Sequence, residues 1–236
     1  MAAERVSYAA MGRHSETIEA RVHGTFLVEE PLVVATGPAR AAVVGFHGYG
    51  ETAEDHLAAL RRLPGADRWL LCAVQGLHPF YRKNGDVVAG WMTSFDREHA
   101  IADNVAYCGA VVARLRERWG VERLAYTGFS QGVAMAYRTA AGAGHPSHAL
   151  VALAGDVPPD VAKGGLSNLP PVLIGRGSGE QWYTEAKLAA DLEVLRSGGV
   201  PVDTAAFDGG HEWTDAFLAR AGTFLAAALD GAPRQR

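Results

Sequence analysis

The sequence predicts one domain of the α/β class, with a mostly parallel, doubly wound sheet and helices on both of its faces. Short apolar runs alternate with segments of helical period along residues 41–229, a pattern typical of parallel strands joined by helical crossovers. The run 41–46 is apolar on both faces and ends in a glycine-rich turn, as expected of a strand covered by helices on each side. With 48% hydrophobic residues, the 236-residue chain can bury a full core without a second domain.

Before this alternation, residues 17–28 partly alternate apolar and polar side chains around His23 and Gly24, which predicts two short antiparallel strands. Residues 1–15 lack such a pattern, and we expect a poorly structured extension there. The main strands are predicted at residues 41–46, 69–74, 123–127, 149–154, 171–175 and 202–207. The helices are predicted at residues 52–62, 97–119, 131–141, 184–196 and 213–229.

Residues 75–96 break the alternation, because they are long for a connection between a strand and a helix. Among its glycine and polar residues the segment carries large apolar side chains, namely Phe80, Tyr81, Trp91, Met92 and Phe95. So many aromatic residues argue against disorder. We therefore expect a small aromatic-rich lid that forms part of a substrate pocket. The alternative is a surface loop held together by its own aromatic side chains.

Residues 128–132, Gly-Phe-Ser-Gln-Gly, match the GxSxG motif and lie between a predicted strand and a predicted helix, as that motif requires. The serine of such a turn has a strained backbone, so small residues must stand two positions before and two after it. Gly128 and Gly132 meet this need. The turn also places Ser130 at a helix N-terminus, where free amides favour the negative charge that develops on an attacked carbonyl. Ser130 is the predicted nucleophile, and the alternative is a serine that only caps the helix.

A serine hydroxyl becomes a good nucleophile when a histidine, itself held by a carboxylate, takes its proton. Of the nine histidines, His211 follows the predicted strand 202–207 in a glycine-rich loop, at the edge where open α/β sheets place their sites. The acid should follow a strand between Ser130 and His211. Glu180 and Asp156 both meet this condition, and the residues alone leave the choice between them open.

The segment Phe46-His47-Gly48-Tyr49-Gly50 closes the first apolar strand and is similar to the HG loops that supply one donor of an oxyanion hole. We expect the backbone amides of Tyr49 and Gln131 to be the two donors, with His47 shaping the loop. The alternative for His47 and Gly48 is a simple turn that ends the strand.

Together these residues resemble the phospholipase/carboxylesterase family of α/β-hydrolases, which includes the acyl-protein thioesterases. The resemblance runs from Val43 to Leu229 and rests on four ordered blocks at residues 46–51, 128–132, 175–182 and 209–213. It implies the α/β-hydrolase fold with a small lid, no cofactor, and hydrolysis of short-chain or lipid-derived esters and thioesters.

The resemblance also bears on the acid and the pocket. Family members usually carry aspartate in the turn after the strand that matches residues 171–175, and Glu180 stands there in this chain, so Glu180 is favoured over Asp156. A glutamate can do the same work, because the acid only fixes the imidazole tautomer and stabilises the imidazolium. The implied substrate-binding residues are His47, Gly48, Trp91, Met92 and Trp182. A bulky wall of Trp91 and Met92 favours a short or compact acyl group.

Composition and missing motifs argue against other classes. The chain has 22 basic and 26 acidic residues without a basic cluster, for a net charge of -4, which disfavours nucleic acid as a partner. The sequence lacks HExxH, paired cysteine spacing and phosphate-binding glycine motifs, so we expect no metal and no nucleotide. Without a signal-peptide pattern or a membrane-length apolar run, we expect a cytoplasmic protein with no stable membrane insertion. A homodimer would be in keeping with the family.

The predicted function is therefore a serine carboxylesterase acting on a small-molecule ester or thioester with a short to medium acyl group. One alternative is a catalytically weak α/β-hydrolase that works as a ligand-binding module, because a fold does not guarantee an activity. Another is a lactonase or lysophospholipase that uses the same triad.

Overall fold

The computed structural model describes residues 14–32 and 40–230. The extension predicted at residues 1–15 therefore lies almost wholly outside the described residues. Its last two residues, His14 and Ser15, are exposed and have no regular secondary structure.

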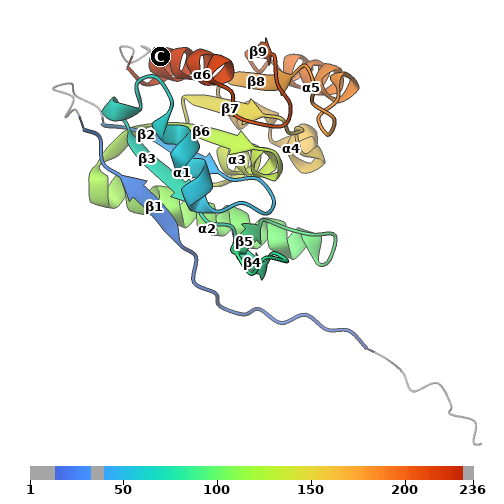
Figure 1. Cartoon of the computed structure of the whole chain (residues 1–236). Helices are drawn as coiled ribbons and strands as arrows, with labels where there is room; N and C mark the ends of the chain where they lie inside the picture. Colours follow the sequence, from blue (N-terminus) through green and yellow to red (C-terminus); the bar gives the residue numbers. More distant parts are fainter. Residues whose placement is uncertain (1–13, 33–39, 231–236) are drawn as a thin grey trace, which may run out of the picture.

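Within the described ranges, the strands form a seven-stranded sheet and a separate two-stranded hairpin (Figure 1). The order in the large sheet is β1-β3-β2-β6-β7-β8-β9; β1 is antiparallel to β3, and the other neighbours are parallel. Its strands are β1 (Phe26–Glu29), β2 (Arg40–Phe46), β3 (Leu70–Val74), β6 (Val121–Phe129), β7 (Ala149–Leu153), β8 (Val172–Gly177) and β9 (Val202–Phe207). Because β3 and β6 lie on opposite sides of β2, the strand order reverses between β2 and β6, which is where open α/β sheets bind ligands.

Helices cover both faces of this sheet (Figure 1). One apolar layer contains side chains of α1 and α6, and the opposite layer contains side chains of α2, α3 and α5. The helices are α1 (Ala53–Arg61), α2 (Arg97–Trp119), α3 (Gln131–Gly142), α4 (Pro159–Gly164), α5 (Glu185–Ser197) and α6 (Asp215–Leu229). The doubly wound α/β architecture predicted from the alternating pattern is thereby confirmed.

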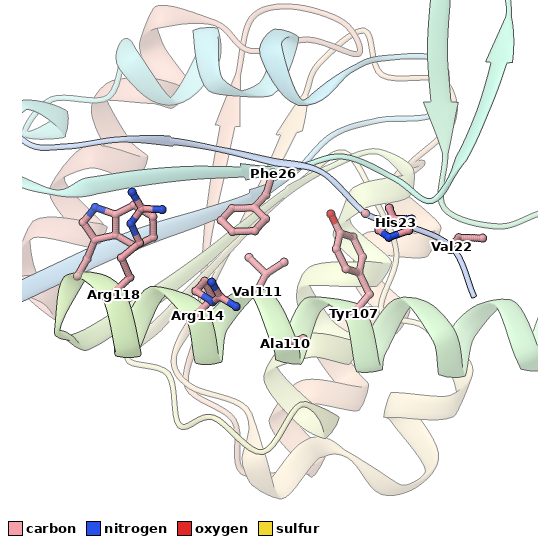
Figure 2. A pocket seen from close by; sticks show the side chains of 10 residues that line it. Val22, His23, Phe26, Tyr107, Ala110, Val111, Arg114 and Arg118 are labelled. Atoms are coloured by element: carbon pink, nitrogen blue, oxygen red, sulfur yellow. The ribbon is translucent and has the colours of Figure 1, made fainter. Parts of the chain in front are cut away.

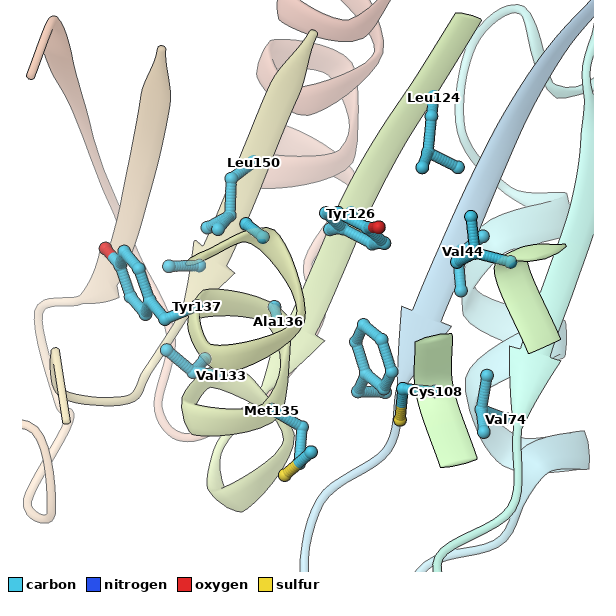
Figure 3. Close-up of a cluster of buried hydrophobic side chains, with 14 of the residues drawn as sticks. Val44, Val74, Cys108, Leu124, Tyr126, Val133, Met135, Ala136, Tyr137 and Leu150 are labelled. Atoms are coloured by element: carbon cyan, nitrogen blue, oxygen red, sulfur yellow. The ribbon is translucent and has the colours of Figure 1, made fainter. Parts of the chain in front are cut away.

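Alternate residues of each central strand face the two layers, as the pleat of a strand requires. In β2, Val43 packs in the same cluster as Leu60 of α1, whereas Val44 packs in the cluster of Cys108 from α2 and Tyr137 from α3 (Figure 3). Each of these side chains is buried, and burying one of this size stabilises the fold by roughly 1.5–3 kcal/mol. The strand is therefore apolar on both faces because both faces lie inside the protein.

The structure corrects the prediction at the start of the chain. Residues 14–25 are exposed and form no strand, so the antiparallel pair predicted within residues 17–28 was wrong. Only β1 forms, and it pairs with β3, with Phe26 opposite Val74. The apolar side chains behind that prediction are not buried in this stretch: Ile18 is 89% exposed and Val22 66% exposed.

Several further elements were not predicted. Within residues 75–96, β4 (His78–Tyr81) and β5 (Val87–Gly90) form an antiparallel hairpin. Between β7 and β8, helix α4 is followed by a short 3-10 turn, Leu166–Asn168.

No helix among the described residues combines the length and the apolar character that a bilayer span needs.

Candidate active site

Ser130 lies in the turn between β6 and α3, beside the point where the strand order reverses. Its backbone has φ 53° and ψ −119°, a combination that residues other than glycine rarely adopt. Such a conformation persists only where the surrounding structure imposes it, and it is concentrated at functional sites. The strained turn expected from the GxSxG motif is therefore present.

Close neighbours on both sides impose this conformation. A Cβ atom on Gly128 would lie 2.6 Å from the carbonyl oxygen of Gly132, and one on Gly132 would overlap the carbonyl oxygen of Phe46 at the end of β2. On the other side, the Ser130 amide donates a hydrogen bond of 2.9 Å to the carbonyl of Leu153 in β7. The turn is therefore held between β2 and β7, and both glycines are required by packing.

His211 and Glu180 contact each other directly. Nδ1 of His211 lies 2.6 Å from Oε2 of Glu180. The Glu180 side chain is 0% exposed, while that of His211 is 28% exposed. The histidine thus presents part of its ring to solvent and rests on a carboxylate that solvent does not reach.

The loops that carry these two residues pack closely. The Ser178 amide donates to the Phe207 carbonyl and the Gly179 amide to the Gly209 carbonyl, both at 2.8 Å. A Cβ atom on Gly177 would overlap the Gly209 carbonyl oxygen. This backbone pairing extends the β8–β9 contact beyond the strands and brings the loop of Glu180 against the loop of His211.

Glu180 is held as a carboxylate. Its Oε1 accepts hydrogen bonds from the amides of Trp182 (2.6 Å) and Tyr183 (3.2 Å), and Oε2 faces His211. Burial raises the pKa of this carboxyl, but the hydrogen bonds from Trp182, His211 and Tyr183 outweigh burial and lower the pKa below its usual value. At neutral pH the site therefore holds a negative charge beside Nδ1 of His211.

Asp156, the alternative acid, lies elsewhere. Its side chain is 49% exposed and forms a 2.9 Å ion pair with Nζ of Lys187. The structure thus brings Glu180, and not Asp156, to His211.

His211 also lies close to the residue that precedes the predicted nucleophile. The rings of His211 and Phe129 have centroids 4.8 Å apart, and the ring of Trp213 lies 6.2 Å from that of Phe129. Phe129 is buried, so this contact fixes the lateral position of the imidazole at the edge of the sheet that carries Ser130.

His47 organises the loop that follows β2. Its Nδ1 donates to the Gly48 carbonyl (2.7 Å), its Nε2 accepts from the Gly76 amide (3.0 Å), and its own carbonyl accepts from Nε1 of Trp91 (2.8 Å). Burial lowers the pKa of His47, in keeping with a neutral ring that donates at one nitrogen and accepts at the other. His47 thus connects the loop after β2 to both ends of the 75–96 segment.

Two neighbours of His47 complete this loop. The Gly48 amide donates to Oε2 of Glu51 at 2.7 Å, and burial raises the pKa of the Glu51 carboxyl. The side chain of Tyr49 is 59% exposed and stacks on Phe80 of β4, with ring centroids 5.1 Å apart. The Gly48 amide is therefore bound to Glu51. The next amide along the chain, that of Tyr49, is the one that the sequence predicts as an oxyanion-hole donor.

The side chain of Gln131 has a role that the sequence did not predict. Its Oε1 accepts from the Trp91 amide (2.8 Å) and its Nε2 donates to the Met92 carbonyl (2.9 Å). Gln131, which the sequence predicts to contribute its backbone amide to the oxyanion hole, therefore also holds the end of the 75–96 segment through its side chain. Side-chain contacts of this kind join distant parts of the chain and leave no local sequence signal.

The structure corrects the predicted pocket wall. Trp91 is 0% exposed and Met92 4% exposed, and the Trp91 ring packs edge-on against Phe46 at 5.6 Å. Both side chains belong to the core behind the site and do not form an open wall. Trp182, by contrast, is 76% exposed on the loop of Glu180, where a substrate could reach it.

An open cavity of about 290 Å³ lies beside the His211 ring. We call it the carboxylate groove, because three acidic side chains, those of Glu51, Asp55 and Glu212, lie along it. Its complete lining is Glu51, Asp55, Ala58, Ala59, Arg62, Phe129, His211, Glu212 and Trp213.

A second cavity, of about 400 Å³, lies between α2 and the segment that leads into β1 (Figure 2). Phe26, Tyr107, Val111, Arg114 and Arg118 are among its lining residues. Its lining includes none of the nominated site residues. The described residues also contain no group of three or more His, Cys, Asp or Glu side chains arranged to hold a metal ion.

No family model matches the chain, and no curated protein matches it. Solved structures do match over most of its length. Esterase PE8 superposes with a TM-score of 0.68 at 22% identity, covering 88% of this chain and 100% of the esterase. The Bacillus cereus carboxylesterase gives 0.67 at 14% identity, covering 87% and 95%. Acyl-protein thioesterase 2 of Zea mays gives 0.63 at 19% identity, covering 87% and 99%.

These likenesses and the strand order show that the chain has the α/β-hydrolase fold. At identities of 14–22% the superpositions speak for the fold alone.

Proposed function

We propose that the chain is a serine carboxylic ester hydrolase related to the phospholipase/carboxylesterase family, with Ser130, His211 and Glu180 as its triad. The observation that carries this proposal is the 2.6 Å contact between Nδ1 of His211 and the buried Glu180 carboxylate, at the sheet edge where Ser130 is strained. A carboxylate that holds Nδ1–H leaves Nε2 as the nitrogen that accepts a proton.

In the proposed reaction, Nε2 of His211 takes the hydroxyl proton of Ser130 while the serine oxygen attacks the ester carbonyl. The amides of Tyr49 and Gln131 stabilise the oxyanion, helped by the positive end of the α3 dipole. His211 then gives its proton to the leaving alcohol or thiol, which departs and leaves an acyl-serine.

Water completes the cycle. His211 removes a proton from a water molecule as the water attacks the acyl-serine, and it returns that proton to Ser130 when the carboxylic acid leaves. Glu180 keeps its negative charge throughout and stabilises the imidazolium each time it forms. Each proton taken up is thus released within one turnover, and the reaction uses no cofactor.

The proposed substrates are small esters, and also thioesters, with short to medium acyl groups. Burial of Trp91 and Met92 removes the sequence argument for a bulky acyl wall. The groove of about 290 Å³ beside His211 does not include Ser130 in its lining, so the preference for short to medium acyl groups is left to the acyl-length series below.

The test is hydrolysis of p-nitrophenyl esters of increasing acyl length by the native chain and by Ser130→Ala, with labelling by a fluorophosphonate probe alongside. Ser130→Ala should lower turnover by about 10⁴- to 10⁶-fold and abolish labelling. Ser178→Ala is the matched control, because Ser178 is an exposed serine on the loop of Glu180, and it should keep both.

A native chain that hydrolyses none of the esters and is not labelled by the probe would refute the proposal and favour a ligand-binding module. Turnover that survives in Ser130→Ala would place the nucleophile elsewhere.

A further inference from the structure

A second carboxylate, that of Asp191, lies behind the turn that carries Glu180. It belongs to α5, and the residue is only 8% exposed. Burying a carboxylate is unfavourable unless hydrogen bonds compensate. The triad mechanism does not use this group, so its place in the fold requires another explanation.

The hydrogen bonds of Asp191 reach two loops at the site's edge of the sheet. Its Oδ2 accepts from the hydroxyl of Tyr183 at 2.8 Å and from the amide of Val157 at 3.1 Å. Tyr183 follows β8 and Val157 follows β7. One carboxylate oxygen thus ties α5 to both loops.

Tyr183 connects this carboxylate to the acid of the proposed triad. Its side chain is fully buried and donates to Asp191, while its amide donates to Oε1 of Glu180 at 3.2 Å. Its carbonyl accepts from Nε of Arg176 at 2.9 Å. With its side chain, amide and carbonyl all engaged, Tyr183 leaves the Glu180 turn little freedom to shift.

We propose that Asp191, acting through Tyr183, is a positioning residue that holds the Glu180 carboxylate in line with His211. The proposal rests on the proposed function, because positioning matters to turnover only if Glu180 serves as the triad acid. Negatively charged Asp191 makes charge-assisted hydrogen bonds, which are about twice as strong as neutral ones.

The charge on Asp191 should respond to pH within the working range of an esterase. Burial raises its pKa, the hydrogen bonds from Val157 and Tyr183 oppose this, Asp156 raises it and Lys187 lowers it, and the result is about 6. The buried hydroxyl of Tyr137 on α3 also faces it. Above this pH the carboxylate holds Tyr183 strongly, and below it the protonated form holds Tyr183 less well.

The same shift affects stability in the opposite direction. An aspartate whose pKa is higher in the folded than in the unfolded state binds more protons when folded, so its charge destabilises the fold at neutral pH. Removing the charge while keeping an acceptor should therefore leave Tm at alkaline pH unchanged or raise it. If the positioning role holds, activity falls in the same variant.

The variants are Asp191→Asn, whose amide oxygen still accepts from Tyr183 but cannot titrate, and Tyr183→Phe, which lacks the hydroxyl. Tyr126→Phe is the matched control, because this buried hydroxyl of β6 also has no hydrogen-bond partner among the described residues and does not interact with Asp191 or Tyr183. We expect kcat on a p-nitrophenyl ester to fall by about tenfold in the first two, since a small misplacement of a catalytic group is costly. KM should not change, and the control should retain its kcat.

Two further readouts separate positioning from a merely structural role. As the pH falls, kcat of the native chain should decrease through one more protonation step than kcat of Asp191→Asn. The downfield proton resonance of Nδ1–H in His211 should shift in Asp191→Asn and Tyr183→Phe, and not in Tyr126→Phe.

Unchanged kcat and an unchanged resonance in Asp191→Asn and Tyr183→Phe would overturn the proposal, as would a fall in Tm without a fall in kcat. The resonance keeps this test distinct from that of the proposed function. If the native chain hydrolysed no ester, a resonance that shifts only in the Asp191 and Tyr183 variants would still show that they position the pair.

Discussion

Replacing Glu180 with glutamine tests the proposed triad sharply, because the structure dictates how the new side chain must sit. Oε1 of Glu180 accepts from the amides of Trp182 at 2.6 Å and Tyr183 at 3.2 Å, whereas Oε2 faces Nδ1 of His211. Only an acceptor can occupy the first position, so the amide oxygen of glutamine will take it. The NH₂ group of glutamine must then face His211.

This orientation selects the wrong tautomer of the histidine. An NH₂ group donates and does not accept, so Nδ1 of His211 must become the acceptor and the ring proton must move to Nε2. A protonated Nε2 cannot take the proton of Ser130. The corresponding exchange in a serine protease lowers kcat by about 10⁴-fold, which is roughly 5 kcal/mol of transition-state stabilisation.

The assay is kcat on a p-nitrophenyl ester at alkaline pH, with thermal unfolding to verify that each variant folds. Asp156→Asn is the control, because it removes a carboxylate that pairs with Lys187 at the surface and should change kcat by less than about threefold. A Glu180→Gln variant that keeps a tenth or more of the native kcat would refute the reasoning. So would a larger loss in Asp156→Asn than in Glu180→Gln.

Three further predictions concern the serine turn, a buried histidine and the carboxylate groove. In urea denaturation, Gly132→Ala should lower the free energy of unfolding by about 3 kcal/mol, because its Cβ would overlap the Phe46 carbonyl oxygen, whereas Gly164→Ala, which has open space around it, should change it little. Burial lowers the pKa of His56 from 6.5 to about 3, so between these two values His56 binds a proton in the unfolded chain but not in the folded chain. The native chain should therefore lose about 2 kcal/mol more stability than His56→Gln on going from about pH 7 to about pH 5, and equal losses would contradict this. Finally, the carboxylate groove should make an ester with an anionic leaving group react more slowly than its neutral analogue, by a factor that shrinks at high salt; a ratio that does not depend on salt would count against it.

Most of the fold could be predicted because its strands and helices have strong periodic patterns. The predicted helix 97–119 and strand 202–207 coincide with α2 and β9. The helix predicted at 52–62 becomes α1, which starts after the cap formed by Thr52 and Asp55. In these segments local preference and tertiary burial favour the same structure.

The exceptions are segments in which distant contacts decide the structure. β1 finds its partner in β3, more than forty residues further along the chain, and no local pattern in residues 17–28 identifies that partner. In the hairpin, Pro79 weakens the strand signal, although Asn84 and Gly85 form the turn signal that could have revealed it.

The candidate site likewise contains residues that the sequence could predict and residues that it could not. The positions of Ser130 and His211 follow from motif spacing and from the rule that sites lie at the carboxyl ends of parallel strands. Those rules left Glu180 and Asp156 both open, and only the family resemblance favoured Glu180. Aromatic content could not tell that Trp91 points into the core, because a loop sequence does not determine side-chain direction. The second hydrogen-bonding partners, such as Asp191 behind Glu180, come from a helix that has no motif of its own.

The serine turn also has a consequence for how the protein matures. The conformation of Ser130 depends on Phe46 and Gly132 on one side and on the Leu153 carbonyl on the other. Leu153 follows Ser130 in the chain, and His211 comes later still, so a nascent polypeptide that has just exposed its serine cannot yet hold it in the reactive shape. A chain truncated before residue 153 should not react with fluorophosphonates. The rate at which a refolding sample becomes labelled would then report how fast the last strands assemble.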